Sequence, residues 1–152
     1  MVHFSVQSDH LHLMVEAVDR KALLGGVRGL SVSLARRVNR LVFRRGRVIA
    51  DRWHGRALST PRAVRHALVY VLGNFRKHER SAGDGVDPFS SAPYFSGFAE
   101  FAQGVPVAGD LRRVAGSELA RGSPALEPRS WLLRAGWRRY GLISIREAPR
   151  GH

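Results

Sequence analysis

Two histidines separated by one residue, in the run His10-Leu11-His12, are the first side chains along the chain whose spacing could do chemistry. Side chains alternate across a β-strand, so both imidazoles point to one face and can converge on a divalent cation. Leu11, Leu13 and Val15 then point to the other face, which we expect to pack into the core. The alternative is two polar residues on an exposed strand face, and this pair alone leaves it open.

A second set of chemistry-bearing side chains lies on a helix that we expect from Pro61 to about Lys77 or His78. At about 100° per residue, Tyr70 and Asn74 share one face, a turn apart. That face lies well away from the apolar stripe, so Tyr70 is not needed for the core. His66 and Lys77 lie on the Tyr70 side, where each is either a phosphate contact or an ordinary solvated residue. The stripe itself consists of Val64, Ala67, Leu68, Val71, Leu72 and Phe75.

The elements that must position these residues follow from local patterns. Residues 2–17 alternate around a Ser8-Asp9 turn signal and predict a β-hairpin. Asp19 is a suitable N-cap for an amphipathic helix that runs to about Phe43, although three glycines weaken its first turns. Residues 48–58 read as a strand. Ser59 or Thr60 caps the next helix, whose first residue is Pro61.

The remainder of the chain has a different character. Residues 81–93 are rich in Gly, Ser, Asp and Pro and predict an ordered loop or linker. Residues 94–127 have weak periodicity, with a short helix expected near 110–121, and residues 130–140 look helical. We therefore divide the chain into a catalytic domain at 1–80, a connection at 81–93, and a basic extension of unassigned role at 94–152.

The charge distribution indicates a polyanionic partner. The chain holds 25 Lys and Arg residues against 12 acids, and its net charge is +13. Residues 20–80 carry 16 of the basic residues with only Asp51 and Glu79 against them. Such a block favours nucleic-acid binding. Trp53 could stack on an unpaired base, although a core position is the stronger interpretation. The arginines that we expect on the nucleic-acid surface are Arg36, Arg40, Arg44, Arg45, Arg47, Arg52 and Arg56.

Composition also excludes several classes of protein. The chain has no cysteine, so a disulfide framework and a thiolate metal site are excluded. No apolar run approaches the roughly 20 residues that span a bilayer, and the first 18 residues do not resemble a signal peptide. We expect a cytoplasmic, nucleoid-associated protein with no membrane partner and no small-molecule cofactor.

Taken together, these residues resemble the single-tyrosine HUH transposases. The resemblance rests on the His-hydrophobic-His pair after a short turn and on a helical Tyr followed four residues later by Asn. The runs Gly46–His54 and Thr60–Leu72 look like the REP-associated tyrosine transposase branch of that family. The match covers about residues 2–80, and a weaker one extends through residues 88–91.

The resemblance implies a fold and a mechanism. The fold is α+β, a ferredoxin-like antiparallel sheet flanked by helices, with the histidines on a central strand. His10, His12 and Asn74 would hold Mg²⁺ or Mn²⁺, and Mn²⁺ should bind imidazole at least as well. Tyr70 would attack a phosphodiester in single-stranded or hairpin DNA and form a 5′-phosphotyrosine.

The sequence departs from the family pattern at its start. Family members carry a further strand and helix before the segment that matches His3, so we expect a sheet that is one strand short. Two rival interpretations stay open beside the enzyme: a catalytically inactive, DNA-binding remnant of a transposase, and a metal-dependent phosphoesterase that uses activated water. Oligomeric state is also open.

Overall fold

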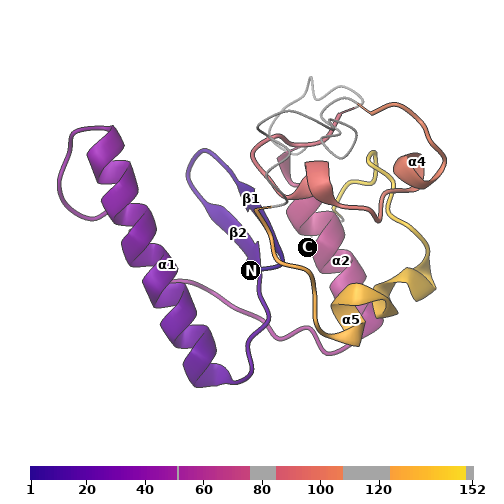
Figure 1. Cartoon of the computed structure of the whole chain (residues 1–152), viewed down its shortest axis with the longest axis horizontal. Helices are drawn as coiled ribbons and strands as arrows, with labels where there is room; N and C mark the ends of the chain where they lie inside the picture. The colour runs from indigo at the N-terminus through magenta and orange to yellow at the C-terminus, as the bar shows by residue number, and fades with distance from the viewer. Residues whose placement is uncertain (51, 76–84, 108–123, 150–152) are drawn as a thin grey trace. The chain divides into compact units, whose positions relative to one another are not determined.

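The computed structural model describes residues 1–50, 52–75, 85–107 and 124–149. These residues belong to two compact units, one formed by Met1–Glu16 with Leu58–His152 and the other by Ala17–Ala57. This division does not follow the expected boundaries at residues 80 and 94. The first unit contains strands β1 (His3–Val6) and β2 (Leu11–Met14), helices α2 (Pro61–Gly73), α4 (Ala99–Ala102) and α5 (Trp131–Arg134), and the 3₁₀ helices η1 (Ala92–Tyr94) and η4 (Gly136–Tyr140) (Figure 1). The described part of the chain is thus a small α+β protein with a two-stranded antiparallel sheet and four α-helices.

The expected β-hairpin is confirmed, but the face that we assigned to the core was wrong. β1 pairs antiparallel with β2, with His3 opposite Met14 and Ser5 opposite His12. Helix α2 packs against the face that carries these four residues, and His3, Ser5 and Met14 are buried there. On the other face Leu11 and Leu13 are only half-buried, and Val15 is exposed. Alternation along a strand predicts two faces, and a distant helix decides which one is covered.

The outer edge of β1 is paired by a segment far along the chain. The Val6 amide donates to the Phe89 carbonyl at 2.9 Å, and the Ser91 amide donates to the Phe4 carbonyl at 2.9 Å. These bonds flank an antiparallel bridge between Ser5 and Ser90. An unpaired edge is an aggregation risk, so this pairing protects the short sheet. Residues 85–93 are accordingly an ordered, largely buried part of the first unit and not a linker, while 81–84 lie outside the described residues.

Helix α2 forms as its local sequence predicts. The Thr60 hydroxyl accepts the Ala63 amide at 3.1 Å, and Pro61 occupies the first turn. The expected apolar stripe is confirmed, because Val64, Leu68, Val71 and Leu72 are all buried. Val69 is buried as well, although it lies off that stripe. As described, the helix ends at Gly73 with Asn74 as its C-cap, and the end expected at 77 or 78 lies outside the described residues.

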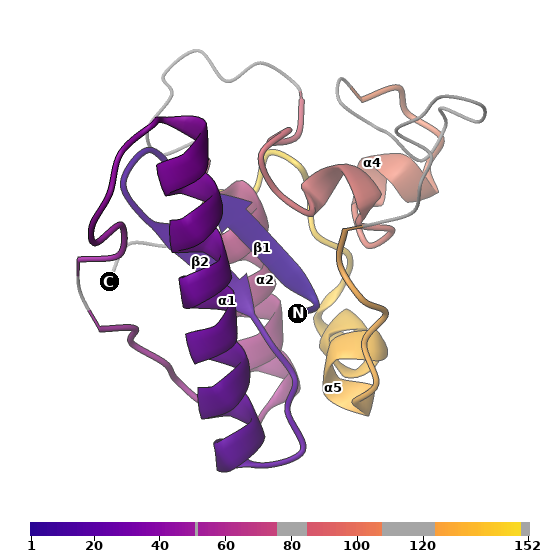
Figure 2. The same cartoon turned by 60° about the vertical axis from the view of Figure 1, so that its left-hand side comes forward.

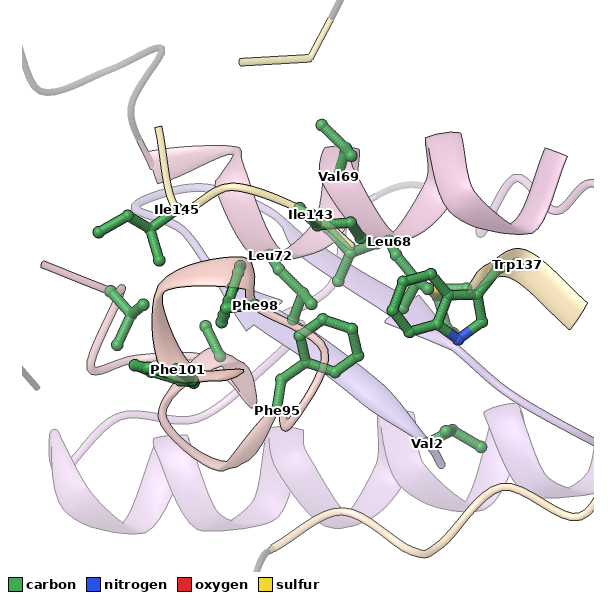
Figure 3. Packing of buried hydrophobic residues seen from close by; sticks show 14 of the residues in the cluster. Val2, Leu68, Val69, Leu72, Phe95, Phe98, Phe101, Trp137, Ile143 and Ile145 are labelled. Carbon is green, nitrogen blue, oxygen red and sulfur yellow. The ribbon is translucent and has the colours of Figure 1, made fainter. Parts of the chain in front are cut away.

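The C-terminal segment explains why α2 has a second buried face. Ile143 and Ile145 pack into the same core as Val69, together with Phe95, Phe98 and Trp137 (Figure 3). A Cβ on Gly73 would lie 3.2 Å from the Glu147 carbonyl oxygen. Glycine at position 73 therefore permits the close approach of this segment, which accounts for a residue that otherwise weakens a helix.

Arg65 ties the same segment to α2. Its guanidinium donates to both carboxylate oxygens of Glu147, at 2.6 and 2.8 Å. It also donates to the Leu142 carbonyl at 3.0 Å and to the Gly141 carbonyl at 3.2 Å. Bidentate, charge-assisted bonds of this kind are stronger than neutral ones and fix geometry. The C-terminal segment is thus a structural part of the first unit.

Two further expectations are changed by the structure. Residues 48–50 and 52–58 form no strand, because alternation alone cannot make a strand without a partner edge. The helix expected at 130–140 is present as two short pieces, α5 and η4, which meet at Ala135, where φ is −141°. The short helix expected near 110–121 lies outside the described residues.

The second unit is built on one long helix, α1 (Arg20–Leu41), which Figure 2 shows as uninterrupted despite three glycines. Its expected cap is confirmed: Asp19 Oδ1 accepts the Ala22 amide at 2.7 Å. The helix ends within two residues of the expected Phe43, and its apolar stripe is nowhere fully buried. Among the residues that the structure describes, no helix has the length and apolar character needed to cross a bilayer.

Candidate active site

Two histidines of the hairpin meet two side chains of α2 that lie about 60 positions farther along the chain. They are His10 and His12 on one side, and Tyr70 and Asn74 on the other. The His12 ring lies edge-on to the Tyr70 ring, with 4.8 Å between centroids. The His10 and His12 rings are 4.6 Å apart in a similar arrangement. The Asn74 amide nitrogen lies 3.5 Å from His10 Nε2. The structure therefore brings together all four residues that the sequence singles out as catalytic or metal-binding.

His10 is oriented from both of its ring nitrogens. It lies just before β2, at the end of a turn that the Gln7 amide closes by donating to the His10 carbonyl at 2.9 Å. The Asp9 carboxylate lies 2.5 Å from Nδ1, and Nε2 faces Asn74. A carboxylate bonded to one imidazole nitrogen fixes the tautomer and the orientation of the ring, an arrangement typical of metal-ligating histidines. Nε2 is thus the nitrogen suited to hold a cation.

Tyr70 and Asn74 differ in exposure although they share a face of α2. Tyr70 is 37% exposed, while Asn74 is 2% exposed. The exposed ring leaves the phenol accessible to a large substrate, which a buried tyrosine would not be. A buried amide needs polar partners, and His10 supplies one at this position. Asn74 therefore has a packing environment that holds it beside the histidines.

The donor set fits a hard or borderline divalent cation. His10 and His12 offer imidazole nitrogens, and Asn74 offers an amide whose oxygen and nitrogen exchange on rotation about χ2. Within the described ranges no three His, Cys, Asp or Glu side chains gather as a metal site, so a cation here would need the Asn74 amide as its third protein ligand. Two imidazoles and one amide oxygen suit Mn²⁺ somewhat better than Mg²⁺.

A buried polar cluster beside this site was missed in the sequence analysis. The Ser5 hydroxyl, opposite His12 in the sheet, donates to Asp87 Oδ2 at 3.1 Å. Asp87 Oδ1 accepts the Phe89 amide at 2.8 Å, and Ser91 Oγ lies 3.2 Å from His3 Nδ1. These side chains fix the 85–91 segment against β1. One sequence feature could have predicted this cluster: alternation along β1 puts the polar residues His3 and Ser5 on the same face of the hairpin as His12.

Burial gives one residue of this cluster an unusual acidity. Desolvation lowers the pKa of His3 from its ordinary 6.5 to about 4. His3 is therefore neutral at physiological pH and can share a hydrogen bond with Ser91. Its role is structural, because its ring packs edge-on against Phe95 with 5.2 Å between centroids.

The arginines expected on the nucleic-acid surface are all exposed. Two of them also shape the chain after α1: Arg44 donates to the Arg47 carbonyl at 2.9 Å, and Arg47 donates to the Ile49 carbonyl at 2.7 Å.

His66 is exposed on α2, one turn before Tyr70, and Lys77 lies outside the described residues. The core position that we favoured for Trp53 was wrong, because its side chain is 49% exposed. The exposed set in the second unit is Arg36, Arg40, Arg44, Arg45, Arg47, Arg52 and Arg56.

Comparison with protein-family models, with curated proteins and with solved structures finds no match to this chain.

Proposed function

We propose that the chain is a metal-dependent DNA strand transferase of the single-tyrosine HUH type, with Tyr70 as its nucleophile. The observation that carries this proposal is the convergence of His10, His12 and Asn74 around an exposed tyrosine. Nothing in a hydrophobic core requires two histidines, a buried amide and an exposed tyrosine at one place. The fold proposed with this function is the ferredoxin-like arrangement of the HUH endonucleases.

The reaction that this geometry supports is a transesterification. Tyr70 Oη gives its proton to water and attacks phosphorus in single-stranded or hairpin DNA. The bond from phosphorus to the 3′ oxygen breaks, the leaving oxygen takes a proton from water, and a 5′-phosphotyrosine remains. One phosphoester replaces another, so a 3′ hydroxyl can reverse the step without ATP. A phenol is a poor nucleophile at neutral pH unless it is activated.

Each side chain of the site then has a defined role. His10 and His12, with the Asn74 amide, would hold Mg²⁺ or Mn²⁺, which supplies charge neutralisation on the phosphoryl oxygens. Asp9 orients the His10 ring. Tyr70 is the only one of the four that forms a covalent bond to substrate. The arginines of the second unit would contact the phosphate backbone.

Covalent trapping tests this proposal. Hairpin DNA labelled at its 3′ end is incubated with the protein and Mn²⁺ and run on a denaturing gel. A labelled protein band is expected for the parent chain and for Tyr94→Phe, a matched loss of a phenol elsewhere. It is expected to vanish in Tyr70→Phe. Cleavage that persists without Tyr70 and is lost in His12→Ala would identify a phosphoesterase that uses water.

The cation site has a readout that does not depend on activity. A ligand that binds only the folded state stabilises it by about 2.7 kcal/mol when its concentration is 100 times its dissociation constant. We therefore expect Mn²⁺ to raise the melting temperature of the parent chain. His10→Ala and Asn74→Ala should abolish most of that rise, whereas His66→Ala should retain it.

A DNA-binding protein without catalysis is the second candidate. The exposed arginines of the second unit favour it, because their charge is independent of the tyrosine site. It predicts salt-sensitive DNA binding with no covalent band, and equal binding by Tyr70→Phe. Nucleoid association would follow from either candidate.

A further inference from the structure

A second surface of the first unit combines exposed arginines with a half-exposed tryptophan. Residues 129–146 contain five arginines and no Asp or Glu. Three of these arginines, Arg134, Arg138 and Arg139, are exposed on α5 and η4. Trp131, at the start of α5, is 48% exposed. We refer to these four residues as the Trp131 surface.

The tryptophan and one arginine are held together at this surface. The Arg139 guanidinium carbon lies 4.9 Å from the centre of the Trp131 ring. The ring lies so close to Gly136 that a Cβ there would be 2.7 Å from its Cζ3 atom. The residues between Trp131 and Arg139 therefore place a planar cation on an aromatic ring while leaving about half of that ring accessible to solvent.

Contacts of neighbouring residues attach the Trp131 surface to the core. Trp137, between Arg138 and Gly136, is 1% exposed, and its indole nitrogen donates to the Leu133 carbonyl at 3.1 Å. Arg138 lies over the Trp137 ring at 5.0 Å. Arg65 of α2 binds the carbonyls of the next two residues after η4. The backbone that carries these exposed arginines is thus fixed relative to the helix that carries Tyr70.

We infer that the Trp131 surface binds unpaired DNA on one side of the cleaved phosphodiester, an inference that rests on the proposed function and extends it. Guanidinium planes and aromatic rings stack on unpaired bases, and guanidinium groups also bond phosphates. Glu16 accepts the amides of Arg129 and Ser130 just before Trp131, so one acid lies at the start of α5. The three exposed arginines leave the surface with a net positive charge, which favours a polyanion over a protein partner. Single strands are favoured over duplex DNA, because duplex base faces are covered by their neighbours.

The position of Arg65 on α2 indicates that the Trp131 surface is separate from the tyrosine site. Arg65 and Tyr70 are five residues apart, which is about 7.5 Å along the helix axis and about 140° around it. A strand bound at the Trp131 surface therefore approaches Tyr70 from another side of α2. The surface would hold the flanking strand and leave the reacting phosphate to the histidine site.

Binding without chemistry tests this inference. The full chain carrying Tyr70→Phe is titrated into fluorescein-labelled oligothymidylate of about 20 nucleotides, in EDTA, and anisotropy is measured. Trp131→Ala and Arg139→Ala are each expected to weaken binding by about 5-fold or more, as stacking losses of at least 1 kcal/mol imply. Trp131→Phe should restore most of the binding. Arg129→Ala is the charge-matched control, because Arg129 faces Glu16, and it should change binding less than about 2-fold.

The outcomes separate this inference from the proposed function. Losses for Trp131→Ala and Arg139→Ala, with rescue by Trp131→Phe, support the Trp131 surface whether or not the covalent band forms. Arg139→Ala indistinguishable from Arg129→Ala would overturn it, since Arg139 is exposed and its loss cannot unfold the core. Equal losses on a duplex of the same length would also overturn it, because stacking on unpaired bases would then play no part.

Discussion

Removing Arg65 should destabilise the first unit far more than removing its carboxylate partner. Arg65 makes four hydrogen bonds, two to Glu147 and two to backbone carbonyls of residues 141 and 142. Its side chain is 14% exposed and that of Glu147 is 34% exposed. Hydrogen bonds to charged groups contribute about 1.5–3 kcal/mol each when buried, and less where water can compete.

The two single variants therefore differ in which hydrogen bonds of Arg65 they remove. Glu147→Ala loses the ion pair, which at this exposure is worth about 1 kcal/mol, while Arg65 keeps its two carbonyl contacts. Arg65→Ala loses the pair and both carbonyl contacts, so we expect a loss of about 3 kcal/mol. Arg65→Lys should lie between them, because an ammonium cannot reproduce the planar fork.

Urea unfolding followed by tryptophan fluorescence measures these differences. In the double variant the loss should equal that of Arg65→Ala alone, which gives a coupling of about 1 kcal/mol between the two side chains. In Arg65→Ala, limited proteolysis should first cut the segment that follows residue 140, because Arg65 no longer holds it against α2. The reasoning would be refuted if Arg65→Ala were no more destabilising than Glu147→Ala, or if the two losses simply added.

Three further predictions concern the core and the segment that pairs with β1. Because burial lowers the pKa of His3 to about 4, the unfolded chain binds a proton that the folded chain does not between about pH 6.5 and 4. Unfolding free energy should therefore fall by about 3 kcal/mol as pH drops through that window, and His3→Gln, which cannot titrate, should remove most of this slope above pH 5. Gly97→Ala would place a Cβ 2.4 Å from Phe95 and 2.5 Å from Trp137, so overpacking should cost about 1–3 kcal/mol; a melting temperature equal to the parent's would contradict this. Asp87→Ala removes the acceptor of the Ser5 hydroxyl and the Phe89 amide, and should cost about 2 kcal/mol and speed hydrogen exchange at the Val6 amide; unchanged exchange there would mean that Asp87 does not hold this segment.

The parts of the fold that depend on neighbouring residues were predictable from the sequence. The hairpin, the Asp19 and Thr60 caps, and the placement of Tyr70 off the apolar stripe follow from periodicity and local hydrogen bonding. The meeting of the histidines with Tyr70 and Asn74 was predicted from the family resemblance. Periodicity alone could not predict this meeting, because the sequence of the second unit, Ala17–Ala57, lies between the hairpin and α2.

Features that depend on distant contacts were missed or wrong. The covered face of the hairpin depends on α2, and the buried role of Val69 depends on Ile143 and Ile145. Ser5 and Asp87 are 82 positions apart, so their bond leaves no local pattern. The strand expected at 48–58 failed for the same reason: alternation was present, but the described chain offers it no partner edge.

Mass spectrometry of the covalently trapped product is the most direct test of the central claim. The proposal predicts one phosphotyrosine adduct after digestion, on the peptide that contains Tyr70, dependent on Mn²⁺ and on both histidines. An adduct on Tyr94 or Tyr140, or cleavage of the DNA with no adduct, would contradict it.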